Sequence, residues 1–139
     1  MKVLVINGVN LNRLGSRSEE YGNVTLADIR RETAELGKKL KADVEFFTSN
    51  HEGEIVEAIQ NTDADGIIIN AGAYTHYSLA IADALKDKTC RKIEVHLTNI
   101  YAREQFRRTS VLSPCVDGVI AGFGKNVYLL ALTEISRNG

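Results

Sequence analysis

Short apolar runs alternate with helix-like segments along the whole 139-residue chain. The run 3–6 (Val-Leu-Val-Ile) is continuous and rich in β-branched residues, as expected for a strand covered on both faces. Four further runs are typical of strands of the same kind, at residues 44–47, 66–69, 93–97 and 118–121. Because parallel strands need crossover connections, this alternation predicts a parallel sheet with helices on both sides.

Four other segments have apolar residues at a helical spacing. In the first, one stripe holds Leu26, Ile29, Leu36 and Leu40. Thr25, with Asp28 three residues later, resembles a capping box at the start of this helix. The other three helices are expected around residues 55–59, 79–85 and 127–135. Five strands with these helices favour an α/β, flavodoxin-like three-layer sandwich whose parallel sheet has the order 2-1-3-4-5.

Length, charge and cysteine usage narrow the class of protein. We expect residues 1–139 to form one domain, and a net charge of −1 gives no field that would attract nucleic acid or an anionic membrane. Cys90 and Cys115 lack the spacing of a redox or metal motif, which predicts two buried thiols in a reducing compartment. The first apolar run is too short for a signal-peptide core, and no stretch approaches the ~20 apolar residues that span a bilayer. We therefore expect a cytoplasmic protein.

Two connections are long and polar, at residues 8–24 and 98–115, and both begin at carboxyl ends of predicted strands, where parallel sheets bind ligands. Asn10 in the first either forms a turn, since Asn tolerates positive φ, or contacts a ligand. Arg17 and Tyr21 follow it. A tyrosine with the usual pKa near 10 is a poor base at neutral pH, but a neighbouring guanidinium favours the phenolate. A loop with both residues can also close over a ligand.

Polar residues also follow the third predicted strand. Asn70 and Gly72 can present a side-chain amide and backbone N–H groups to a polar ligand. The alternative is a helix start capped by Thr75, with His76 in its first turn.

The fourth strand and the segment after it carry ionisable groups. Glu94 and His96 are two residues apart and so point to the same face of a strand. Either the histidine is a structural core residue, or the carboxylate fixes the imidazole tautomer for acid–base catalysis, which the cost of burying an ionisable pair favours. Arg107 either belongs to an exposed basic face or reaches an anionic substrate. His51 and Glu52 lie at a helix start, but the sequence HEGE lacks the second histidine of a metalloprotease helix, so we predict no metal.

Five segments then occur in one order: GVNLNRLGSR…YG, SNHEGE, INAGAYTHYSLAIADAL, IEVHLTNIYAREQFRRTSVLSP and GVIAGFGKNVYLLAL. Together they resemble type II 3-dehydroquinate dehydratases (type II dehydroquinases) over essentially the whole chain. The resemblance implies a hydro-lyase without a cofactor, which reversibly removes water from 3-dehydroquinate by anti elimination through an enolate to give 3-dehydroshikimate. That reaction serves aromatic amino acid (chorismate) biosynthesis by the shikimate pathway, or quinate catabolism.

The resemblance also implies a role for individual residues. Tyr21 would be the base and Arg17 would keep it ionised, while Asn10 would help hold a water that stabilises the enolate. His96, oriented by Glu94, would protonate the departing hydroxyl.

Substrate binding would involve side chains and backbone groups. The implied binding residues are Asn70, His76, Asp83, Leu97, Thr98 and Arg107, with Gly72 in support. Asn70, His76 and Arg107 would bind hydroxyls, and the N–H groups of Leu97 and Thr98 would hold the carboxylate. Asp83 would come from a neighbouring subunit, because the family assembles as trimers packed into homododecamers (a tetramer of trimers).

The chain departs from the family pattern at several positions. Val9 replaces a common proline, Ala82 a basic residue and Tyr101 a histidine, and the stretch between Arg17 and Tyr21 is about one residue shorter than usual.

Two other functional hypotheses remain. One is a flavodoxin-like module that binds a nucleotide or flavin phosphate, for which the glycine-rich phosphate signatures are missing. The other is a structural or regulatory protein with an inactive site.

Overall fold

The computed structural model describes residues 1–16 and 22–137. A single five-stranded sheet runs through the described part of the chain, in the order β2-β1-β3-β4-β5 with every pair parallel. The strands are β1 (Lys2–Asn7), β2 (Asp43–Thr48), β3 (Gly66–Asn70), β4 (Arg91–His96) and β5 (Gly118–Ala121). The α-helices are α1 (Leu26–Leu40), α2 (Glu52–Asn61), α3 (Leu79–Asp87) and α4 (Asn126–Arg137). The predicted fold class and strand order are confirmed.

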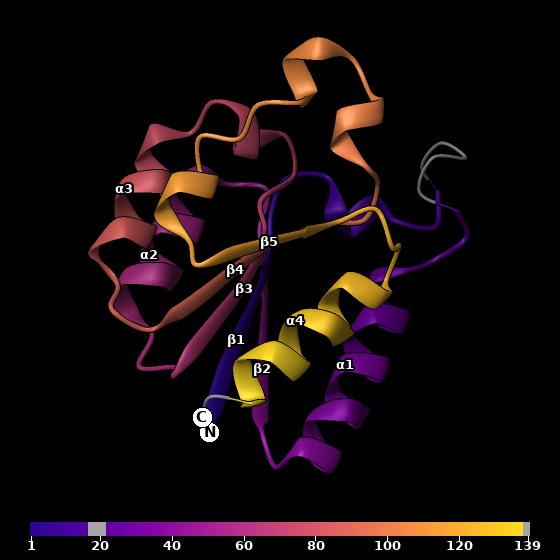
Figure 1. The fold of residues 1–139 in the computed structure, drawn as a ribbon, viewed down its shortest axis with the longest axis vertical. Coiled ribbons are helices and arrows are strands. Elements are labelled where there is room, and N and C mark those ends of the chain that lie inside the picture. The colour runs from indigo at the N-terminus through magenta and orange to yellow at the C-terminus, as the bar shows by residue number, and fades with distance from the viewer. Residues whose placement is uncertain (17–21, 138–139) are drawn as a thin grey trace.

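The helices cover both faces of the sheet, with α1 and α4 on one side and α2 and α3 on the other (Figure 1). Two apolar cores result, because alternate strand residues face opposite sides. Val3, Val5 and Ile68 pack in the core with α1 and α4, while Ile67 and Ile69 pack in the core with α2 and α3. None of the described helices is both long and apolar enough to cross a membrane.

The two edge strands differ from the expectation of strands covered on both faces. The central strands β1, β3 and β4 are almost completely buried, whereas every residue of β2 is exposed or only partly buried. On β5 the side chain of Val119 is exposed. The physical reason is position: an edge strand has one neighbour, and the helices cover it less completely than the centre.

The starts of α1 and α3 are both capped by local side chains, but only the cap of α1 was predicted. Thr25 and Asp28 form the predicted capping box at the start of α1, each side chain accepting a hydrogen bond from the other's backbone N–H. The alternative of a helix capped by Thr75 is wrong. Residues 72–76 form a short 3₁₀ helix, and the cap of α3 is Ser78, whose Oγ accepts from the Ile81 N–H at 3.0 Å.

The two cysteines are free thiols, as expected, but Cys90 and Cys115 are partly buried rather than buried. Both pack at the margin of the core with α2 and α3. Partial burial raises the pKa of the Cys90 thiol, despite the opposing charges of Lys92 and Lys88.

Candidate active site

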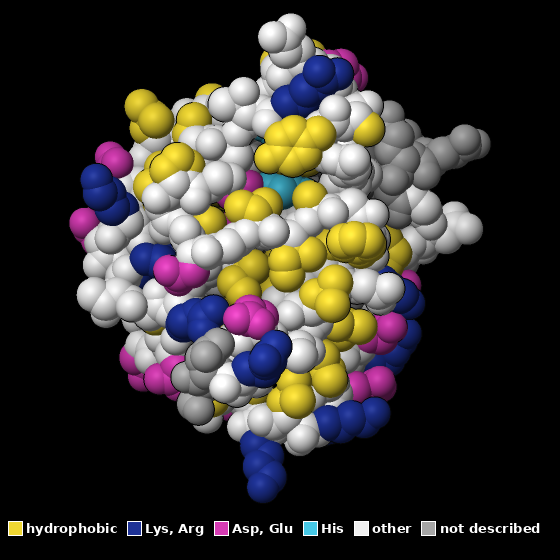
Figure 2. Space-filling model, in the orientation of Figure 1, with side chains coloured by type: hydrophobic (Ala, Val, Ile, Leu, Met, Phe, Trp, Pro, Cys, Tyr) yellow, Lys and Arg dark blue, Asp and Glu magenta, His cyan; other side chains and the backbone are white. Residues whose placement is uncertain are grey.

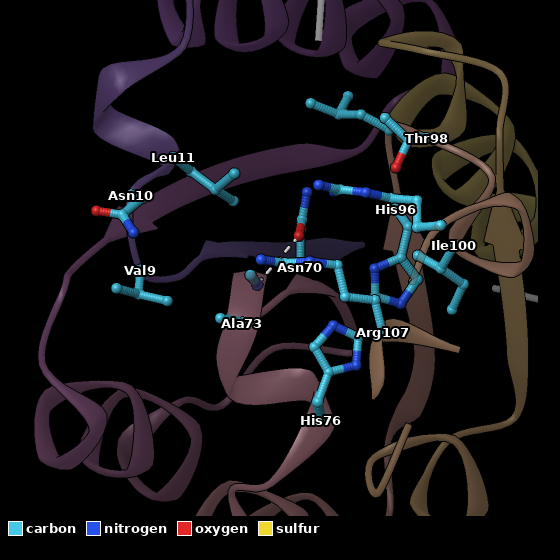
Figure 3. A pocket seen from close by; sticks show the side chains of 13 residues that line it. Val9, Asn10, Leu11, Asn70, Ala73, His76, His96, Thr98, Ile100 and Arg107 are labelled. Atoms are coloured by element: carbon cyan, nitrogen blue, oxygen red, sulfur yellow. Dashed lines mark hydrogen bonds between the residues drawn. The ribbon is translucent and has the colours of Figure 1, made fainter. Parts of the chain in front are cut away.

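A pocket opens at the carboxyl edge of the sheet, where the connections after β1, β3 and β4 meet (Figure 3). This is the topological switch point of the sheet: β1 and β3 are neighbours, yet their helices lie on opposite faces. The pocket is lined by Val9, Asn10, Leu11, Asn70, Gly72, Ala73, His76, His96, Leu97, Thr98, Ile100, Arg103 and Arg107. Both of the long polar connections therefore contribute to it.

The structure brings most of the predicted site residues together. Asn10, Asn70, Gly72, His76, His96, Leu97, Thr98 and Arg107 all line the pocket. Glu94 lies behind His96, fully buried on β4. Asp83 is exposed on α3 and does not line this pocket. Arg17 and Tyr21, predicted as the activating cation and the base, lie outside the described residues.

Glu94 and His96 form a buried dyad at the end of β4. The imidazole Nε2 is hydrogen-bonded to Glu94 Oε2. Because an ionised carboxylate only accepts hydrogen bonds, this contact places a proton on Nε2 and leaves Nδ1 as the other exchangeable ring atom. The dyad can therefore hold an imidazole in one tautomer, ready to give or take a proton at Nδ1.

Hydrogen bonds compensate the burial of the Glu94 carboxylate. Burial alone would raise its pKa, but hydrogen bonds and charge from His96, with further hydrogen bonds from Ser113 and Ser110, hold the pKa of Glu94 below its usual value. The two carboxylate oxygens offer about four lone-pair sites, and His96, Ser110 and Ser113 each contribute one hydrogen bond to them. The carboxylate is ionised at neutral pH and fixed in orientation.

A second buried network orients Asn70 at the end of β3. Its Nδ2 donates to the Tyr128 hydroxyl at 3.1 Å, and that hydroxyl donates to Asn7 Oδ1 at 2.5 Å. Asn70 Oδ1 accepts from the Gly72 N–H at 3.2 Å, the contact drawn in Figure 3. With one N–H and the oxygen occupied, the second Nδ2 hydrogen is the group that Asn70 can offer to a ligand.

The connection after β1 is held against the connection after β3 at very short range. Gly72 has φ of +65°, and an added Cβ would lie 2.5 Å from the Val9 carbonyl oxygen. A Cβ on Gly8 would lie 2.4 Å from the carbonyl oxygen of Ala71. Only glycine permits these two approaches. Asn10 also adopts a left-handed backbone, at φ of +67°, so it makes a turn and lines the pocket as well.

His76 and Arg107 line the pocket from two different segments. His76 ends the 3₁₀ helix at residues 72–76, and Arg107 lies in the connection at residues 98–115. His76 Nδ1 donates to the Thr109 carbonyl at 2.7 Å, because a carbonyl can only accept, and so Nε2 is left for a ligand. The Arg107 guanidinium pairs with Glu104 at 3.1 Å and lies 5.1 Å from the centre of the Phe106 ring. Figure 3 shows His76, Arg107 and His96 grouped on one side of the pocket.

Several pocket residues were not predicted as site residues. The apolar ones are Val9, Leu11, Ala73 and Ile100. Arg103 is the important omission, because it adds a second guanidinium to the pocket. The sequence could have indicated Arg103, because it lies four residues before Arg107 in the same basic stretch after β4. No such signal marked Tyr128, which lies far away in the sequence on a helix that reads as core.

No three His, Cys, Asp or Glu side chains gather as a metal site within residues 1–16 and 22–137. The groups that line the pocket or support it include acid–base groups, amides and guanidinium groups. Such a set can bind a small anionic, hydroxylated molecule and transfer protons to it.

Comparison with known proteins agrees with this geometry. The family described as dehydroquinase class II matches residues 1–136. A protein of Nitratiruptor sp. named 3-dehydroquinate dehydratase is 53% identical over 140 residues, covering 99% of this chain and 90% of its own. One of the same name from Thermotoga petrophila is 50% identical over 138 residues, covering 99% and 96%. The crystal structure of type II dehydroquinase from Butyrivibrio crossotus superposes with a TM-score of 0.95 at 46% identity, covering 97% of each chain. The chain belongs to the class II dehydroquinase family.

Proposed function

We propose that this chain is a 3-dehydroquinate dehydratase and that the pocket at the carboxyl edge of the sheet is its active site. The observation that carries the proposal is the buried Glu94–His96 dyad, which faces a pocket shared with Asn70, His76 and Arg107. The reaction removes water from a ring that bears a ketone, hydroxyls and a carboxylate. It therefore needs a base, an acid and groups that hold an anion, all on one small substrate.

His96 is the proposed general acid. In its protonated form Nε2–H is held by Glu94, and Nδ1–H is available to the leaving hydroxyl. As the carbon–oxygen bond breaks, the hydroxyl takes the Nδ1 proton and departs as water. The Glu94 carboxylate stabilises the imidazolium before transfer and keeps the ring aimed afterwards.

The proposed base is Tyr21, with Arg17 beside it to favour the phenolate. These roles rest on the family resemblance, since both residues lie outside the described part of the chain. Tyr21 would remove the proton next to the ketone, and the electron pair would form an enolate. Asn10, which lines the pocket after β1, would help to hold a water at the enolate oxygen.

Substrate binding is assigned to groups around the dyad. The side chains of Asn70, His76 and Arg107 would contact ring hydroxyls, through the Nδ2 hydrogen, Nε2 and the guanidinium respectively. The backbone N–H groups of Leu97 and Thr98 would hold the carboxylate. Arg103 gives the pocket a further positive charge, which favours an anionic substrate.

Assembly is a further part of the proposal. A homododecamer built from trimers would bring Asp83 of one subunit to the pocket of the next. The exposed position of Asp83 on α3, outside its own pocket, supports this. Exposed Val119, Phe123 and Leu130 also supply apolar surface, and Figure 2 shows hydrophobic side chains gathered over β5 and α4. Such a patch is typical of an interface.

The cellular setting is proposed on narrower grounds. The free cysteines fit a cytoplasmic location. The reaction serves the shikimate pathway, and the same dehydration would serve quinate catabolism. We also propose that residues 1–139 act as a single domain, supported by the two cores that share one sheet.

The direct test mixes the purified chain with 3-dehydroquinate and follows the ultraviolet absorbance of the conjugated product. Tyr21→Phe should abolish turnover with the circular dichroism spectrum unchanged, and His96→Ala should slow turnover by roughly 10²–10⁴-fold. Near-normal turnover by Tyr21→Phe would exclude this tyrosine as the base. If the wild-type chain left 3-dehydroquinate unchanged but retained a flavin or nucleotide, the chain would be a flavodoxin-like binding module and not a dehydratase.

A further inference from the structure

Two serine hydroxyls converge on the oxygen of Glu94 that does not contact His96. Ser113 Oγ donates to Glu94 Oε1 at 2.7 Å, and Ser110 Oγ donates to the same oxygen at 3.1 Å. Glu94 Oε2 is the atom bonded to the His96 ring. The carboxylate is fully buried, so these three donors replace the water that would otherwise solvate it.

The direction of the Ser110 hydrogen bond is determined by its other contacts. Ser110 Oγ accepts from the backbone N–H groups of Leu112 and Ser113, both at 3.1 Å. With both acceptor sites in use, its single proton points to Glu94. Ser110 therefore has two functions, since it also holds the turn that carries Ser113. The Ser113 hydroxyl makes fewer contacts than that of Ser110: among the described residues, Glu94 is its hydrogen-bond partner.

We propose that Ser113 and Ser110 are positioning residues for the dehydration: together they hold the Glu94 carboxylate ionised and in one orientation, so that Glu94 keeps the His96 Nδ1 atom aimed at the leaving hydroxyl. The inference rests on the proposed function and extends it. Neither serine lines the pocket, so both act through Glu94 rather than on the substrate. Both also lie on the connection that carries Arg107, which ties the dyad to the wall of the pocket.

The physical basis is the cost of an unsolvated charge. Without the two hydroxyls, Glu94 Oε1 would face a buried, water-poor environment. The carboxyl would then take up a proton at a higher pH, or turn to share its charge, and the imidazole would lose its fixed partner. The other titratable groups that face the dyad are His76, Arg103 and Arg107, which line the same pocket.

Ser113→Ala is the cleaner test, because Ser110→Ala would also free two backbone N–H groups. We expect Ser113→Ala to lower kcat about 10-fold, with KM within about 2-fold of wild type, since the serine does not contact substrate. Ser113→Thr, which keeps the hydroxyl, should recover most of the loss. In a Glu94→Gln background the same serine change should cost less than about 2-fold, because the group it acts on is gone.

Ser136→Ala is the matched control. It removes a hydroxyl that has no hydrogen-bond partner among the described residues, on α4. Its kcat should equal that of wild type.

A second measurement needs no turnover. The His96 ring resonances, identified by their loss in His96→Ala, are followed by NMR as pH is lowered. The acidic inflection that protonation of Glu94 imposes on them should move to higher pH in Ser113→Ala and stay in place in Ser136→Ala. The inference is overturned if this inflection does not move, or if kcat of Ser113→Ala equals that of the control. Because wild-type turnover is scored separately, failure of the proposed function and failure of the serine inference are distinguishable.

Discussion

Tyr128→Phe removes one hydroxyl and should lower both the stability of the fold and the affinity of the pocket for substrate. The hydroxyl donates to Asn7 Oδ1 at 2.5 Å and accepts from Asn70 Nδ2 at 3.1 Å, and all three side chains are buried. Burial raises the pKa of the Tyr128 phenol, so it stays protonated and available as a donor across the physiological range. Phenylalanine keeps the packing of the ring and deletes only these contacts.

The magnitude follows from the groups left behind. Each buried polar group that loses its partner costs about 1–3 kcal/mol, and here two are orphaned. Asn7 Nδ2 already has no hydrogen-bond partner in the described structure, so Asn7 would have no compensating contact there. Allowing for the hydroxyl that no longer has to be buried, we expect a loss of about 2–4 kcal/mol in the free energy of unfolding. With ~2 cal/mol/K of unfolding entropy per residue, this lowers Tm by roughly 7–14 °C.

Differential scanning calorimetry and urea denaturation measure the effect, with Tyr101→Phe as the control. Tyr101 is 62% exposed, so its hydroxyl should contribute within about 0.5 kcal/mol. Tyr128→Phe should also raise KM for the substrate, because the Asn70 amide loses the hydroxyl that holds it in place. A Tm for Tyr128→Phe within about 2 °C of wild type would refute the reasoning, since about 0.6 kcal/mol cannot represent two orphaned buried groups.

Two further predictions concern the same site. The folded-state pKa of Glu94 is lowered, so its stabilisation is present above the unfolded value of about 4.3 and is lost as pH falls through the folded value. Urea denaturation between pH 3 and pH 7 should therefore show a shallower pH dependence for Glu94→Gln, and parallel curves for the two proteins would contradict it. Gly72→Ala should lower stability by more than about 1 kcal/mol and impair turnover, because a Cβ at φ +65° meets the Val9 carbonyl at 2.5 Å. Gly53→Ala is its control: this exposed helical glycine has open space around a Cβ, so the substitution should stabilise the chain by up to about 1 kcal/mol.

Much of the fold could be predicted from local patterns. The strand at residues 3–6, the four helices and the capping box of Thr25 and Asp28 depend on interactions within a few residues, so the sequence displays them directly. The partial exposure of β2 and β5 could not be predicted in the same way, because it depends on which strands end up at the edges. The cap of α3 was also predicted wrongly: residues 72–76 form a 3₁₀ helix, and Ser78 rather than Thr75 accepts from the first turn of α3.

The residues of the candidate site also fall into two groups, those that the sequence could predict and those that depend on tertiary packing. The sequence could predict that Asn10, Asn70, His76, His96 and Arg107 lie near one another, because parallel strands bring their carboxyl ends to one edge, and all five do line one pocket. Their roles came from the family resemblance and stay predictions. Glu94, the partner of His96, could be predicted as well, because the two residues are neighbours on one strand face. The more distant groups that orient Asn70 and Glu94 could not be predicted. Tyr128 is 58 residues from Asn70 and 121 from Asn7, and Ser113 is 19 from Glu94. Such pairs have no sequence period, because only the packing of helices and connections onto the finished sheet decides which buried polar groups meet.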